Sequence, residues 1–135
     1  MTLYTIEPNQ QTLHGAFSRD LKPVLTVQSR DTVRFRTLDS DWNLEPRTST
    51  NYEEKPKQFS PRPVGQEDGH ALCGPVAIED AQPGMTLAIH VNAIRPGRWG
   101  FTPVGGWPHP INTRLGVADE GTYLLWTLDA ETMQG

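Results

Sequence analysis

Cysteine, surplus positive charge and long apolar runs are all scarce in this chain of 135 residues. With a single cysteine, Cys73, the chain cannot form an internal disulfide, which is typical of proteins in the reducing cytoplasm. No apolar run approaches the ~20 residues that a membrane-spanning helix needs, and the first ten residues lack the basic start and apolar core of a secretory signal. We therefore expect a soluble, cytoplasmic protein.

Basic charge is not only scarce but scattered. Twelve Lys and Arg stand against 16 Asp and Glu, and the formal net charge is −4. The basic residues form no stripe, so the electrostatic footprint of a nucleic-acid-binding protein is missing. Neither nucleic acid nor a membrane is an expected partner.

Helical periodicity is also missing, while 12 Gly and 12 Pro punctuate the chain. Alternation with a period of two is present instead, because Val33 and Phe35 would face one side of a strand and Arg34 and Arg36 the other. A turn at residues 29–31 precedes this strand. Strands are predicted at residues 3–6, 24–28, 32–37, 76–79, 85–94 and 123–128. The length suits one domain, residues 1–135, with an all-β fold, either a sandwich or a distorted barrel.

The densest run of turn and strand signals lies in residues 69–91. Apolar alternation at residues 76–79 and again at residues 87–91 flanks Pro83-Gly84, which supplies a turn with a fixed φ followed by a permitted positive φ. These features predict a β-hairpin with His70 at its entrance.

Two stretches carry few strand signals. Residues 40–69 are polar and contain four prolines, so they are predicted to form a long loop, and loops of this size are usually functional or disordered. Residues 96–116 are rich in Gly and Pro and are predicted to be irregular. The aromatic residues of this stretch are Trp99, Phe101 and Trp107. They would either cover an edge of the core or line a substrate-facing wall. Together with Trp126 they could also form an exposed apolar patch.

The candidate catalytic residues are His14, Asp39 and His70, each with a structural alternative. His14, in an isolated His-Gly, could be a ligand or a hydrogen-bonded turn residue. Asp39 follows a predicted strand, where catalytic carboxylates often sit, but the sequence alone favours an Asx turn with the carboxylate bound to backbone N–H groups. His70 could be a metal ligand, a general base or a structural loop residue.

The other reactive side chains give weaker signals. His90 is predicted on the solvent side of a strand, and His109, between two prolines, in a rigid turn. No nucleophile signature surrounds Cys73, which is typical of a small buried residue. The intervals between His14, Asp39 and His70 match no compact zinc motif, so any metal site must be assembled by the fold.

Several stretches resemble the acetamidase/formamidase family. Its "His-x-Leu-x-Gly-Pro" and "Val/Ile-Glu-x-Ala-x-Pro-Gly" signatures are matched by His70, Leu72, Gly74, Pro75, Ile78, Glu79, Ala81, Pro83 and Gly84. Its opening is matched by His14, Phe17, Pro23, Leu25, Ser29, Asp31 and Val33, and two later motifs by residues 98–101 and 123–128. The chain departs from the family at Arg30, where the family has Gly, and at Met85, where it has Asp.

The resemblance implies an all-β enzyme that hydrolyses a small aliphatic amide, such as formamide or acetamide, to a carboxylate and ammonia. It assigns His14, Asp39 and His70 as ligands of a divalent metal ion, for example zinc, and Asp39 and His70 also as catalytic groups. Asp41 takes the place of Asp39 if the match to the family is shifted by two residues. It further implies a homo-oligomer, or a complementing C-terminal half, as partner. Members of the family are longer, so the chain resembles their N-terminal half and its activity is expected to be incomplete. Two alternatives stay open: a catalytically silent module for small-molecule binding or assembly, and one chain of a split amidase.

Overall fold

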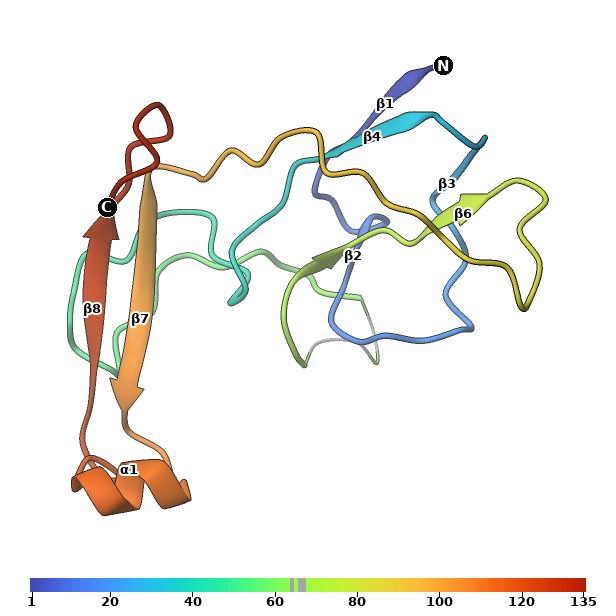
Figure 1. Ribbon diagram of the computed structural model, residues 1–135. Helices are drawn as coiled ribbons and strands as arrows, with labels where there is room; N and C mark the ends of the chain where they lie inside the picture. Colours follow the sequence, from blue (N-terminus) through green and yellow to red (C-terminus); the bar gives the residue numbers. More distant parts are fainter. Residues whose placement is uncertain (64, 66–67) are drawn as a thin grey trace. The chain divides into compact units, whose positions relative to one another are not determined.

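In the computed structural model the regular secondary structure is almost wholly β, in short strands joined by long irregular segments (Figure 1). The structure describes residues 1–63, 65 and 68–135. Within them lie one helix, α1 (Pro110–Leu115), and the strands β1 (Leu3–Ile6), β2 (Leu13–His14), β3 (Leu25–Val27), β4 (Thr32–Phe35), β5 (Leu72–Cys73), β6 (Val76–Ile78), β7 (Trp99–Gly105) and β8 (Gly121–Thr127). The predicted all-β class is confirmed. The strands pair into two-stranded sheets, and the described residues close no barrel.

The chain divides into two compact units. Unit 1 contains Met1–Asn43 and Phe59–Ile89, and unit 2 contains Leu44–Gln58 and His90–Gly135. The assignment of residues 1–135 to a single domain stays a prediction.

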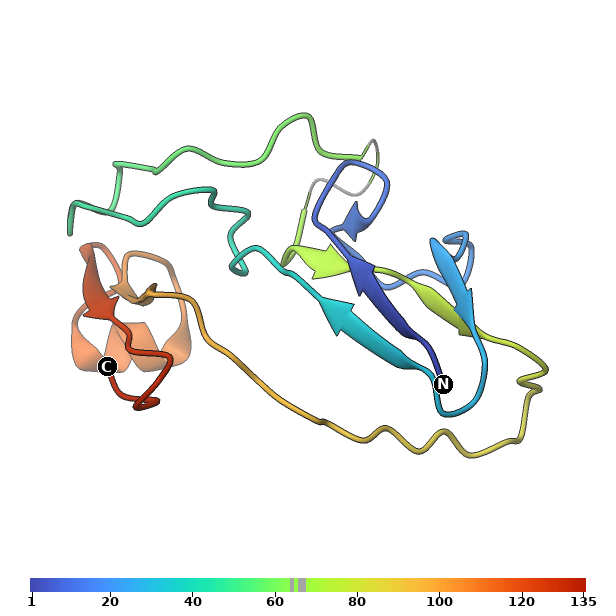
Figure 2. The same ribbon diagram turned by 90° about the horizontal axis from the view of Figure 1, so that it is seen from above.

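Unit 1 holds three of the small sheets. β1 pairs in parallel with β4, β3 pairs in parallel with β6, and β2 pairs antiparallel with β5 (Figure 2). The buried apolar side chains of the unit come from these strands and from the loop that follows β4: Ile6, Leu13, Val27 and Trp42. The predicted strands at residues 3–6, 24–28, 32–37 and 76–79 are confirmed, each within two residues of its observed end.

The predicted turn at residues 29–31 is confirmed as well. Asp31 N–H donates to the Gln28 carbonyl over 3.1 Å, and Arg30 takes a positive φ of 74°. The Asp31 carboxylate accepts hydrogen bonds from Thr2 N and Gln28 N, and these lower the pKa of Asp31. A positive φ costs about 1 kcal/mol in a residue with a side chain, and the Asp31 hydrogen bonds help to hold the turn.

The predicted hairpin over residues 69–91 is wrong. The Pro83-Gly84 turn exists, since Gly84 has a φ of 93° and Met85 N–H donates to the Gln82 carbonyl over 3.1 Å. However, β6 pairs with β3, and residues 85–94, predicted as a strand, belong to none. A Pro-Gly pair with positive φ at glycine has the pattern of a type II turn, which splays the flanking strands instead of matching their twist.

Unit 2 is built on the long β7–β8 ribbon, in which Trp99 pairs with Thr127 and Gly105 with Gly121. The predicted strand at residues 123–128 is confirmed as β8, although it begins two residues earlier. The prediction of irregular structure for residues 96–116 is wrong, because they contain β7 and α1. Pro103 is compatible with β7 because a two-stranded ribbon leaves each strand one unpaired edge.

The long loop predicted at residues 40–69 is confirmed for its described residues, which form no helix and no extended strand. In unit 2, Asn51 of this loop bridges to Thr122 of β8. In unit 1, Trp42 packs into the core. Among the described residues, no helix has both the length and the apolar character needed to cross a membrane.

Candidate active site

His14 lies on β2 in unit 1 and is only 8% exposed. Its ring Nδ1 is 3.0 Å from the carbonyl oxygen of Ala16. The hydrogen bond of the structural alternative is therefore present, although His14 lies on a strand and not in a turn, and this bond uses only one of the two ring nitrogens. When Nδ1 donates this hydrogen bond, Nε2 keeps the lone pair that can bind a proton or a metal ion.

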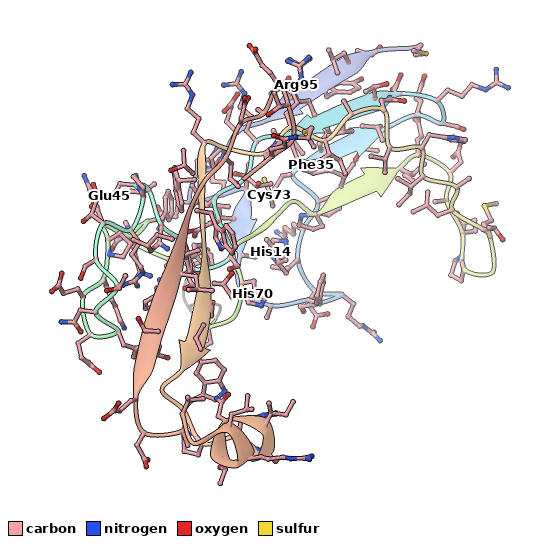
Figure 3. All side chains as sticks on the ribbon, turned by 60° about the vertical axis from the view of Figure 1, so that its left-hand side comes forward. His14, Phe35, Glu45, His70, Cys73 and Arg95 are labelled. Carbon is pink, nitrogen blue, oxygen red and sulfur yellow. The ribbon has the colours of Figure 1, made fainter. Side chains whose placement is uncertain are left out.

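His70 lies just before β5 and is exposed to solvent. Its segment runs beside that of His14, because His14 pairs with Leu72 across the β2–β5 ladder. A Cβ atom placed on Gly69 would lie 2.2 Å from the Gly15 carbonyl oxygen, so the backbones approach closely where the two histidines stand. Figure 3 labels both side chains in this region of the unit.

Asp39 follows β4 and forms the predicted Asx turn. Its Oδ1 accepts hydrogen bonds from Asp41 N over 3.0 Å and Asn43 N over 2.8 Å, and its Oδ2 accepts one from Asn43 Nδ2 over 2.8 Å. The structural interpretation of Asp39 is thus confirmed. Because both carboxylate oxygens already accept hydrogen bonds, the turn fixes the orientation of the Asp39 side chain.

Two hydrogen bonds hold the Asp39 segment against the His70 segment. Ala71 N–H donates to the Ser40 carbonyl over 3.0 Å, and Trp42 Nε1 donates to the Gly69 carbonyl over 2.9 Å. The structure therefore brings together the backbone segments that carry His14, Asp39 and His70. Their joint action as catalytic groups or ligands stays a prediction.

Trp42 is the residue of this region that the sequence interpretation missed. It is 1% exposed, its ring centroid lies 6.3 Å from that of Phe59, and the Arg62 guanidinium lies 4.9 Å from the ring centroid. Its φ of 65° is costly for a bulky residue, and such strain persists only where the surroundings impose it. A lone tryptophan inside a polar, proline-rich stretch was the available signal.

No metal centre is complete in the part of the chain that the structure describes. Within residues 1–63, 65 and 68–135, no group of three or more His, Cys, Asp or Glu side chains is placed to hold an ion. Two surface cavities, of about 540 and 310 Å³, lie in unit 2, and neither is lined by His14, Asp39 or His70.

The remaining two histidines are His90 and His109. His90 is exposed as expected, but it does not lie on a strand. His109 was expected in a rigid turn and is the N-cap of α1, where its Nδ1 accepts a hydrogen bond from Ile111 N over 3.2 Å.

Cys73 is half-buried on β5, with its Sγ 3.9 Å from the Arg36 carbonyl oxygen. Burial raises the pKa of the thiol, and the negative charge of Glu7 acts in the same direction, while a hydrogen bond with Thr12 opposes both. A raised pKa keeps the sulfur protonated near neutral pH. This agrees with the expectation of an unreactive residue.

We predict that Cys73 reacts with iodoacetamide only slowly at pH 7. The thiolate is the reactive form, so the modification rate should reach half of its plateau at a higher pH than for an unperturbed cysteine thiol, because burial raises the pKa of Cys73. A pH series of alkylation rates, followed by mass spectrometry with free cysteine as control, measures this. A midpoint at or below that of free cysteine would contradict it.

Comparison with curated proteins and with solved structures finds no match for this chain. One family model, described as the Acetamidase/Formamidase family, matches residues 4–107. The match spans β1 to β7 and includes the segments of His14, Asp39 and His70. The chain therefore belongs to the acetamidase/formamidase family.

Proposed function

We propose that the chain takes part in the hydrolysis of small aliphatic amides, such as formamide and acetamide, to a carboxylate and ammonia. The observation that carries the proposal is the family match over residues 4–107. The cytoplasm is the proposed location, because the single cysteine suits a reducing compartment.

The residues proposed for this reaction are His14, Asp39 and His70. His70 is exposed, so its imidazole can exchange a proton with a bound amide and deliver it to the leaving nitrogen. His14 has one ring nitrogen on the Ala16 carbonyl, which fixes the ring plane. Asp39 is held in its turn by three hydrogen bonds, which supports a role in positioning the loop beside His70.

A divalent ion, for example zinc, belongs to the proposal as a cofactor. The described residues do not fit it by themselves, because they include no three-ligand group. A catalytic zinc site needs three protein ligands and an open position. His14, Asp39 and His70 would have to converge on the ion to hold it, and among the described residues they do not form such a group.

The extent of exposed apolar surface favours one of the alternatives, a chain that is completed by another chain. Five hydrophobic residues are buried, whereas 18 large ones are exposed among the described residues. The accessible surface is 10600 Å², although two separate compact domains of these sizes would expose only about 8,500 Å² together. Apolar surface on this scale marks sites of association. A homo-oligomer or a complementing half is therefore the proposed partner.

The proposal is tested by ammonia release from formamide and acetamide, after removal of metal with a chelator and again after addition of zinc. We expect turnover by the isolated chain to be weak, and His70→Ala to lower it by ~100-fold, a typical loss for a general acid or base. His90→Ala removes another exposed histidine and should leave the rate unchanged. Equal rates for both variants would contradict the role of His70. Fast turnover would contradict an incomplete site.

A further inference from the structure

Residues 85–91 form a continuous segment whose apolar side chains all face solvent. Met85, Leu87, Ile89 and Val91 are between 59% and 75% exposed. They alternate with Thr86, Ala88 and His90, as in a strand with one apolar face. In the part of the chain that the structure describes, these residues have no strand partner.

The segment has none of the features that normally prevent strands from pairing between molecules. Residues 85–94 contain no charged residue, no proline and no glycine, and the flanking charges are Asp80 and Arg95. Monomeric proteins prevent their edge strands from pairing with other chains by placing lysine or other charged residues, or proline, on them. The paired strand β4, by contrast, carries Arg34 and is followed by Arg36.

We propose that this segment pairs antiparallel with the same segment of a second copy of the chain, about a two-fold axis at Ile89. In that register, Ile89 lies opposite Ile89 of the second copy, and Leu87 of each copy lies opposite Val91 of the other. Apolar side chains therefore meet on one face of the paired strands. On the other face, His90 would lie opposite Ala88, and Asn92 opposite Thr86. Every residue thus meets a compatible one, and no like charges are brought together.

The size of the contact suits a weak dimer. The four apolar residues expose on the order of 500 Å² per copy, so two copies would bury up to about 1,000 Å², at the lower end of specific interfaces. Association driven by so small a contact should depend on concentration and should be lost on a single disruptive substitution.

The first experiment measures the dimer fraction by sedimentation velocity over a wide range of concentrations. Ile89→Lys would place two like charges at the axis, and we expect it to weaken dimerisation at least tenfold. The control Asn92→Lys adds the same charge on the other face, and we expect a change below threefold. Because both positions are exposed, neither change should alter folding, which far-ultraviolet circular dichroism checks.

The second experiment tests the register by oxidative cross-linking in a Cys73→Ala background. Ile89→Cys should give a disulfide-linked dimer, because the two residues face each other across the axis. Ile94→Cys should not, since two such residues would be about 33 Å apart along the strands.

Three results would overturn the proposal. A wild-type chain that stays monomeric would exclude the dimer, whether or not it binds an apolar dye or another partner. A dimer that survives Ile89→Lys would place the contact elsewhere. Cross-linking at residue 94 in preference to residue 89 would exclude the two-fold axis at Ile89. None of these results depends on whether the chain hydrolyses amides.

Discussion

Replacing Trp42 with alanine is expected to lower the free energy of unfolding of unit 1 by about 3–5 kcal/mol. The side chain is 1% exposed, contacts Phe59, lies beneath Arg62 and donates a hydrogen bond to the Gly69 carbonyl. Its removal would leave a cavity and an unpaired carbonyl group. Urea unfolding followed by circular dichroism, with hydrogen exchange to report unit 1 separately, measures the change.

Two further variants separate the causes of this loss. Trp42→Phe keeps an aromatic ring but cannot donate to Gly69, so we expect a smaller loss that includes about 1–2 kcal/mol for the missing hydrogen bond. The control Phe17→Ala removes an aromatic side chain that is 90% exposed in the same unit. That change should stay within about 0.5 kcal/mol. Similar losses for Trp42→Ala and Phe17→Ala would contradict the importance of Trp42.

The same tryptophan connects stability to the candidate active site. Its indole N–H binds the carbonyl of Gly69, the residue before His70. Its own backbone N–H donates to the Asp39 carbonyl over 3.3 Å. Loss of the indole should therefore loosen the loop that carries His70 before it unfolds the unit, and faster hydrogen exchange at residues 68–72 would show this.

Local signals in the sequence predict strands in this protein but not their partners. Alternation around Val33 and Phe35 predicts β4, and the turn at residues 29–31 predicts where it begins. Its parallel pairing with β1 places Thr32 beside Leu3, which no local pattern specifies. Register in such sheets is set by the burial of distant side chains.

At residues 85–94, by contrast, a local strand signal is present but no strand forms. The segment has the alternation of a strand, yet β6, on the other side of the Pro83-Gly84 turn, pairs with β3 instead. β7 was missed because glycine and proline interrupt it, although seven cross-strand pairs with β8 stabilise it. In β7 pairing with another strand outweighs the local preference, whereas residues 85–94 have the local pattern but no partner strand among the described residues.

The candidate active site was predictable only in part. His14, Asp39 and His70 could be selected because the surrounding motifs resemble a family. The Asx turn of Asp39 follows from local chemistry, since aspartate commonly binds backbone N–H groups two residues on. The hydrogen bonds from Ala71 to Ser40 and from Trp42 to Gly69 could not be predicted, because they join residues about 30 positions apart.

Unit 2 depends on a different aromatic cluster, centred on Tyr123 of β8. This residue is 9% exposed, and its ring stacks on Tyr52 with centroids 5.3 Å apart and meets Phe101 edge-on at 5.5 Å. The Arg47 guanidinium lies 3.7 Å from the centroid of the same ring, and Arg47 donates hydrogen bonds to the carbonyls of Glu54 and Asn51. The cluster thereby fixes the loop of unit 2 on the β7–β8 ribbon.

We expect Tyr123→Ala to lower the free energy of unfolding of unit 2 by about 3–5 kcal/mol, the usual cost of truncating a buried aromatic side chain. Leu124→Ala is the matched control, because Leu124 is the next residue on the same strand, points to the opposite face and is 50% exposed. Its loss should be below about 1 kcal/mol. Hydrogen exchange of β7 and β8 reports this unit separately.

A double-mutant cycle identifies how much of this loss belongs to the contact between Arg47 and Tyr123. Arg47→Ala is measured in the wild-type chain and in a Tyr123→Leu background, where an apolar side chain remains but the aromatic face is gone. A guanidinium above a ring in a desolvated site is worth up to about 2 kcal/mol. We therefore expect a coupling energy of about 1–2 kcal/mol, well above the error of additivity for independent sites. A coupling near zero would mean that Arg47 holds the loop through the Glu54 and Asn51 carbonyls alone.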